Sequence, residues 1–89
     1  MSNITEEEIL NLLLKELPKE FSAIKTAKQN HDLPELLKLI HKLHGAVCYC
    51  NLPDLRKTLA ALESALKKNM MEIETLFVEF ENQIDGLLG

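Results

Sequence analysis

The sequence predicts an all-α fold, an antiparallel up-down four-helix bundle that forms one domain over residues 1–89. Leu, Glu, Lys and Ala dominate the composition and only 4% of the residues are aromatic, a balance typical of long helices. Apolar residues recur at three- and four-residue steps, which gives a helix one buried face, whereas β-branched residues are too scattered to form alternating strands. Because the connections between the apolar segments are short, the helices are expected to pack as antiparallel neighbours.

The first helix is expected over residues 5–30. Thr5 followed by three glutamates is typical of a helix start, because the hydroxyl caps the first turn and the carboxylates favour its positive end. The apolar stripe continues in phase across Pro18, so we expect one helix kinked at the proline; the alternative is a break into two helices. This stripe consists of Leu10, Leu13, Leu14, Leu17, Phe21 and Ile24.

The second helix is expected over residues 33–50, after a turn in which Asp32 caps it and Pro34 occupies its first turn. We expect Asn51 to end it, because asparagine tolerates the left-handed conformation common at helix ends. The face expected to be buried comprises Leu36, Leu39, Ile40, Leu43, Val47 and Cys50.

The third and fourth helices are expected over residues 52–68 and 70–87. The third has a leucine seam with charged residues expected to face water, namely Arg56, Lys57, Glu63, Lys67 and Lys68. The fourth is expected to bury Ile73, Leu76, Phe77, Phe80, Ile84 and Leu87.

The net charge and the hydropathy of the sequence disfavour two classes, proteins that bind nucleic acid and proteins that span a membrane. The net charge of -4 at pH 7 disfavours a nucleic-acid partner, which requires a concentrated basic surface. No stretch approaches the roughly 18 apolar residues of a membrane span, and no charged leader opens the chain. Cys48 and Cys50 lie about 200° apart on a helix, so they cannot bridge and are expected to be reduced. We expect a cytoplasmic domain that binds no nucleic acid and lies outside the membrane.

The stretch His41-Lys42-Leu43-His44-Gly45 is the candidate site. A glycine inside a helix costs about 1 kcal/mol relative to alanine, and this one lies one turn beyond His41 on the same side. On the helical wheel His41 lies about 140° from the middle of the apolar stripe and is expected to be exposed, with His44 nearer its edge. An exposed imidazole, the space left by a missing Cβ and nearby cationic groups together suit a phosphorylated histidine.

The segment LIHKLHGA, residues 39–46, followed by CYCNLP, residues 48–53, resembles the signature of histidine phosphotransfer (HPt) domains. It is most similar to the HPt domain at the carboxy-terminal end of bacterial BarA/GacS-type hybrid sensor histidine kinases. The resemblance extends over nearly the whole chain, from an acidic, leucine-rich first helix with a proline in its middle to an acidic last helix. Cys48 and Asn51 depart from the small residue and the glycine that are common in the family, which affects docking geometry rather than the acceptor.

The resemblance implies a role for each residue of the site. His41 would be the phosphoacceptor, His44 the supporting basic residue where the family often has lysine, and Gly45 the clearance for the phosphoryl group. Together they would form a two-way phosphorelay: the acceptor takes a phosphoryl group from a receiver-domain aspartate and passes it to an aspartate of a response regulator. Residues expected to contact the partner are Lys38, Lys42, Cys48, Arg56 and Lys57.

The same resemblance implies that the domain has no kinase activity and no cofactor of its own, with Mg²⁺ bound by the partner receiver domain. We expect a monomer, either a separate protein or the cytoplasmic end of an inner-membrane sensor kinase. Two alternatives remain. One is a helical interaction module without chemistry at His41, and the other is a metal site formed by His41, His44 and Cys48, which share a helix face but lack a fourth ligand.

Overall fold

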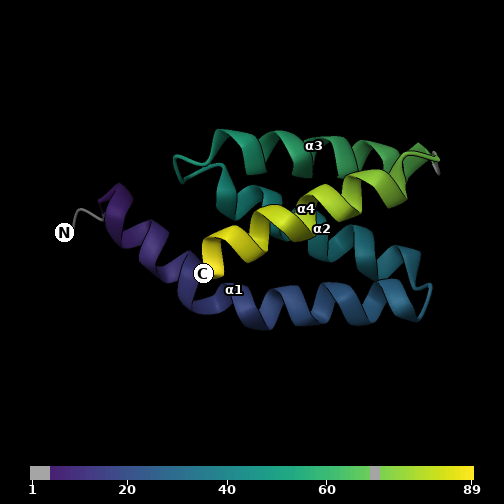
Figure 1. Cartoon of the computed structure of the whole chain (residues 1–89), viewed down its shortest axis with the longest axis horizontal. Helices are drawn as coiled ribbons and strands as arrows, with labels where there is room; N and C mark the ends of the chain where they lie inside the picture. The colour runs from purple at the N-terminus through teal and green to yellow at the C-terminus, as the bar shows by residue number, and fades with distance from the viewer. Residues whose placement is uncertain (1–4, 69–70) are drawn as a thin grey trace.

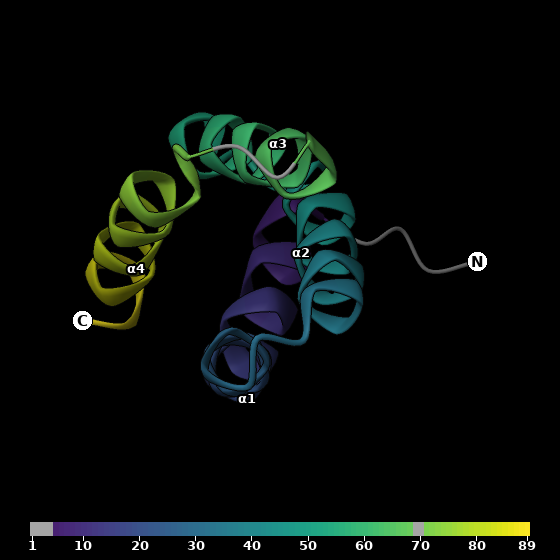
Figure 2. The same cartoon turned by 90° about the vertical axis from the view of Figure 1, so that its right-hand side faces the viewer.

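The computed structural model describes residues 5–68 and 71–89, and the elements in these ranges are all α-helices. The helices are α1 (Glu6–Gln29), α2 (Leu33–Val47), α3 (Pro53–Lys68) and α4 (Ile73–Leu88). Each helix packs against the next in the chain, and α4 also contacts α1 (Figures 1 and 2). The predicted all-α four-helix bundle is therefore confirmed. Within the described ranges, no helix combines the length and the apolar character needed to cross a membrane.

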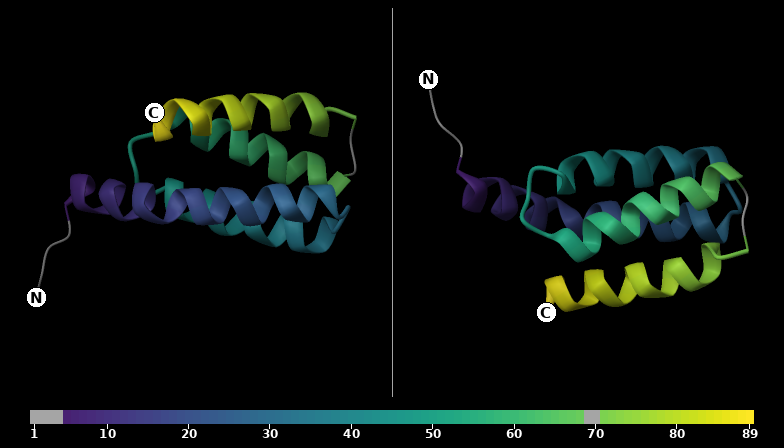
Figure 3. Two further views of the ribbon diagram at one scale, coloured as in Figure 1. Left: turned by 60° about the horizontal axis from the view of Figure 1, so that its bottom comes forward. Right: turned by 90° about the horizontal axis from the view of Figure 1, so that it is seen from above.

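Helix α1 is continuous through Pro18, as predicted. Its first turn is capped by the Thr5 side chain, which accepts a hydrogen bond from the backbone N–H of Glu8 at 3.1 Å. Figure 1 shows the helix axis changing direction along α1, consistent with the backbone hydrogen bond and the ring clash that a proline introduces. Figure 3 shows the amino-terminal turns of α1 extending beyond the rest of the bundle.

The turn between α1 and α2 contains the predicted cap and also a left-handed residue that the sequence did not predict. Asp32 caps α2 as expected, since its Oδ1 accepts the backbone N–H of Glu35 at 3.3 Å. The left-handed residue, however, is His31 with φ of 56°, and among the described residues it is the only non-glycine with a positive φ. Asn51 was expected to end α2 because it tolerates this conformation, but it does not adopt it and α2 ends before it, at Val47.

Helix α2 ends at Val47, three residues before the predicted end at 50. Beyond it the backbone tightens into turns, in which the N–H of Tyr49 bonds to the carbonyl of Ala46 at 3.2 Å and that of Cys50 to Val47 at 2.9 Å. Hydrogen bonds between residues three apart in the chain are typical of helix ends. Cys50 is still buried, as predicted. The start predicted for the last helix, residue 70, lies outside the described residues, and α4 begins at Ile73.

The core lies along the shared axis of the four helices and consists almost entirely of the predicted apolar faces. Phe80 connects α4 to α1, because its ring packs edge-on against Phe21 at 5.7 Å and against Phe77 at 5.6 Å between centroids. Leu39 and Leu52 are half-buried at the edge of the core. One buried residue was predicted to face water, Glu63 on α3, and it belongs to the site.

Candidate functional site

The outer face of α2 carries the residues singled out in the sequence. Helix α2 lies between α1 and α3, so one side of it is buried and the opposite side is open (Figure 2). The side chain of His41 is 73% exposed and that of His44 is 25% exposed. The predicted contrast between an outward His41 and a His44 at the core edge is confirmed.

Both histidines bond to the same buried carboxylate. Nδ1 of His41 lies 2.9 Å from Oε2 of Glu63, and Nδ1 of His44 lies 3.2 Å from Oε1. Because an ionised carboxylate only accepts hydrogen bonds, each imidazole donates its Nδ1–H to it. In the neutral imidazole of His41 the lone pair is then on Nε2, the nitrogen not bonded to Glu63.

The position of Glu63 corrects the expectation that it faces water. The spacing along α3 indicated that Glu63 is buried. Glu63 lies four residues after Leu59 and three before Leu66, both of which are buried, and so falls on the apolar stripe of α3. A carboxylate buried on a helix stripe requires partners, and the two histidines across the α2–α3 contact supply them. The sequence pattern of α3 could have identified Glu63, but not its partners.

The ionised state of Glu63 follows from competing effects. Burial by itself would raise the pKa of this carboxyl group, but the hydrogen bonds from His41, His44 and Lys67 and the charge of His41 lower it, and the net pKa lies below the ordinary value. Lys67, one helical turn further along α3, places its Nζ 3.2 Å from Oε2. The acceptor candidate therefore stands beside a fixed negative charge.

Gly45 has no structural reason to be glycine in the isolated domain. It lies within α2 in a helical conformation, and a Cβ placed on it would meet no atom within 4 Å apart from its chain neighbours and the backbone of its own helix. Neither a positive φ nor close packing inside the chain requires the missing side chain. The space beside His41 is therefore open to a group from outside the chain.

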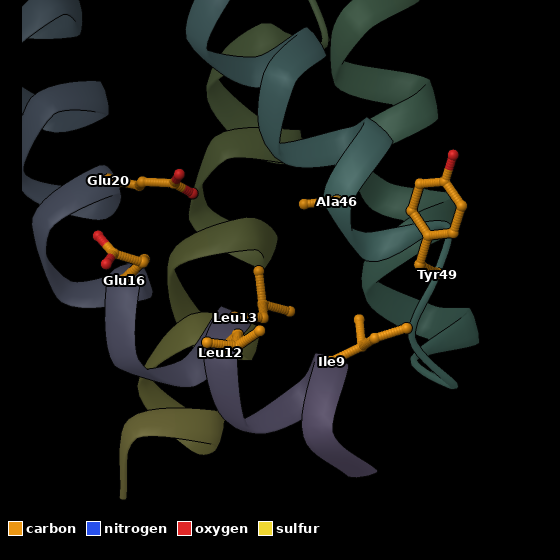
Figure 4. Close-up of a pocket in the computed structure, with 7 residues that line it drawn as sticks. All are labelled: Ile9, Leu12, Leu13, Glu16, Glu20, Ala46 and Tyr49. Atoms are coloured by element: carbon orange, nitrogen blue, oxygen red, sulfur yellow. The ribbon is translucent and has the colours of Figure 1, made fainter. Parts of the chain in front are cut away.

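Two hollows flank the outer face of α2. On the α1 side, a groove of about 360 Å³ is mainly apolar, with two carboxylates along one side (Figure 4). It is lined by Ile9, Leu12, Leu13, Glu16, Glu20, Ala46 and Tyr49. On the α3 side, a mainly basic pocket of about 380 Å³ brings Arg56 and Lys57 together with His44, and Asp54 also lines it.

The remaining predicted partner residues are exposed but lie apart from this basic pocket. Lys38 and Cys48 are exposed on α2 and at its end. Lys42 lines a smaller pocket on the α1 side with Glu16 and Glu20. The basic residues therefore lie on both sides of the face rather than in one patch. Among the residues that the structure describes, no group of three or more His, Cys, Asp or Glu side chains is arranged to hold a metal ion.

Known proteins are similar to this chain over most of its length. Residues 8–89 match the model of the Hpt domain family. The chain is 35% identical over 77 residues to the sensor protein GacS of Pseudomonas syringae pv. syringae, a region that covers 86% of this chain and 8% of that protein. It is 32% identical over 80 residues to the sensor histidine kinase GacS of Pseudomonas protegens, covering 90% of this chain and 9% of that protein. The chain thus spans less than a tenth of the length of these curated relatives, and no solved structure gives a significant match.

Proposed function

Because the chain belongs to the Hpt domain family, we propose that His41 is its phosphoacceptor and that phosphorylation occurs on Nε2. The family match and the similarity to GacS sensor kinases make the domain a phosphorelay intermediate in two-component signal transduction. The observation that carries the assignment of the residue is the hydrogen bond from Nδ1 of His41 to Glu63, which fixes the ring and leaves Nε2 of an exposed side chain available.

The proposed step is a reversible transfer between an aspartate and a histidine. The Nε2 lone pair attacks the phosphorus of an aspartyl phosphate on a receiver domain, the bond between phosphorus and the aspartate oxygen breaks, and its electron pair returns to the carboxylate. The new N–P bond leaves the His41 ring cationic, with its proton still on Nδ1. Glu63 lies against that proton and offsets the charge that develops on the ring.

His44 and Gly45 support this step in different ways. His44 donates to Oε1, the second oxygen of Glu63, so the carboxylate is held from both sides and cannot rotate freely away from His41. Gly45 leaves space on the side from which the phosphoryl donor approaches. His44 therefore acts through Glu63, whereas Gly45 contributes the space left by its missing side chain.

We propose that the partners are the receiver domain of a hybrid kinase and a response regulator. The mainly apolar groove on the α1 side, the pocket with Arg56 and Lys57 on the α3 side, and the exposed Lys38 and Lys42 of α2 would form the docking surface. Mg²⁺ would be bound by the partner receiver, and this domain would have no kinase activity. Reversing the charges of Lys38 and Lys42 should slow transfer, and an unchanged rate would contradict this surface. The relatives are named sensor kinases, so we also propose that the domain works as a cytoplasmic, monomeric part of such a protein.

Transfer from a phosphorylated receiver domain tests the assignment of His41. Label should appear on the domain, be acid-labile, be absent from His41→Gln and persist in His44→Gln. Label on His41→Gln would assign the acceptor elsewhere. Absence of transfer from every one of several candidate receivers would favour an interaction module without chemistry.

A further inference from the structure

Lys67 lies beside the acceptor histidine through a shared oxygen atom. Oε2 of Glu63 is 2.9 Å from Nδ1 of His41 and 3.2 Å from Nζ of Lys67. The two donors therefore meet at one atom, although they come from different helices, α2 and α3. The other histidine, His44, is bonded to the opposite oxygen, Oε1.

The exposure of the three groups differs in a way that matters for a bound anion. The Glu63 side chain is 11% exposed, whereas that of Lys67 is 60% exposed and that of His41 is 73% exposed. A lysine with a flexible four-carbon stem and most of its length in solvent can move its ammonium group over a short distance at small energetic cost. Glu63, by contrast, is fixed by both histidines.

We propose that Lys67 binds the phosphoryl oxygens of phosphorylated His41, moving from Oε2 of Glu63 to the new dianionic group. The proposal rests on the proposed function, because it requires the phosphoryl group to be on His41. Before transfer, the ammonium shares Oε2 of Glu63 with Nδ1 of His41. After transfer, the cationic ring takes over the interaction with Glu63, and the ammonium pairs with the phosphoryl oxygens.

The neighbouring lysine provides a matched control. Lys68 is exposed and follows Lys67 on the last turn of α3, about 100° around the helix, and it forms no ion pair among the residues that the structure describes. Replacing either lysine with methionine removes one positive charge from the same end of the same helix and keeps an unbranched side chain. Only Lys67→Met removes a cation held beside His41.

The test uses the full chain phosphorylated by phosphoramidate, a small donor that requires no docking surface, and follows the phosphoryl group by ³¹P NMR. A nearby cation favours the dianion, so Lys67→Met should raise the pKa of the phosphoryl group by up to about 0.7 unit, the shift expected for an exposed ion pair. Lys68→Met should titrate like the unmodified chain, and Lys67→Arg should restore the lower pKa. Circular dichroism checks that each variant is folded.

The outcomes separate this proposal from the one on which it depends. If His41 is labelled but Lys67→Met and Lys68→Met titrate identically, Lys67 does not bind the phosphoryl group and the role of His41 stands. If the label maps to another residue, or if no histidine is labelled, the acceptor assignment fails and the role of Lys67 fails with it.

Discussion

Replacing Gly45 with alanine should make the domain more stable and the relay slower. Apart from its chain neighbours and the backbone of its own helix, the new methyl group meets no atom within 4 Å, and the position is already helical, so no strain opposes the gain in helix propensity. That gain is about 0.5 to 1 kcal/mol, which raises the melting temperature of a domain this size by about 2 to 8 °C. A methyl group that fills the clearance for a docked partner costs about 1 to 3 kcal/mol, equivalent to a roughly 5- to 150-fold slower transfer.

Gly86→Ala is the matched control. Gly86 also lies two residues before the last residue of its helix, α4, and a Cβ there meets nothing within 4 Å, but it is not on the helix that carries His41. Both variants should gain stability, measured by urea unfolding followed by circular dichroism because the chain has no tryptophan. Only Gly45→Ala should lose transfer from a phosphorylated receiver. Equal transfer rates in the two variants, or a loss of stability in Gly45→Ala, would refute the reasoning that Gly45 is kept for a partner.

Three further substitutions test other parts of the structure. The lowered pKa of Glu63 means that its ionised form stabilises the fold above the ordinary glutamate pKa, and that this contribution is lost as the pH falls through the lower pKa of the folded state. The difference in unfolding free energy between the unmodified chain and Glu63→Gln should therefore shrink on acidification; a constant difference would show that the carboxylate charge is not involved. Phe80→Ala should cost about 3 to 5 kcal/mol in urea unfolding, since Phe80 is fully buried, and a cost below 1 kcal/mol would contradict its central place in the core. Leu12→Glu should weaken receiver binding in a titration while changing stability by less than about 0.5 kcal/mol, because Leu12 is 57% exposed in the α1-side groove; unchanged affinity would remove that groove from the docking surface.

Sequence periodicity predicted the helices and their buried faces because it reports directly which side of a helix avoids water. The stripe of α1 kept its phase across Pro18, and the structure has one continuous helix there. The outward direction of His41 followed from the same wheel. The end of α2 was less predictable, because the turns after Val47 keep Cys50 buried and so continue the apolar pattern beyond the helix.

The hydrogen bonds at the site could not be predicted in the same way. A helical wheel gives the direction of a residue on one helix, but the meeting of Glu63 with His41 and His44 depends on how far α3 is shifted along α2. That shift is set by the packing of many side chains and by the turn that connects the two helices. The helical wheel placed Lys67 in water, and its side chain is largely exposed. Its meeting with His41 at the carboxylate of Glu63 could not be predicted, because that meeting depends on the same shift of α3 along α2.

The position of α2 between α1 and α3 has a kinetic consequence. Its outer face is open while α4 lies on the far side of the bundle (Figure 2), so a receiver domain can reach His41 without displacing a helix. Binding that requires no rearrangement proceeds at the rate of oriented collisions, on the order of 10⁵ to 10⁷ M⁻¹s⁻¹. In the proposed relay, diffusion and ionic strength would then govern the speed of the encounter, and discrimination between regulators would depend on how long each one stays bound.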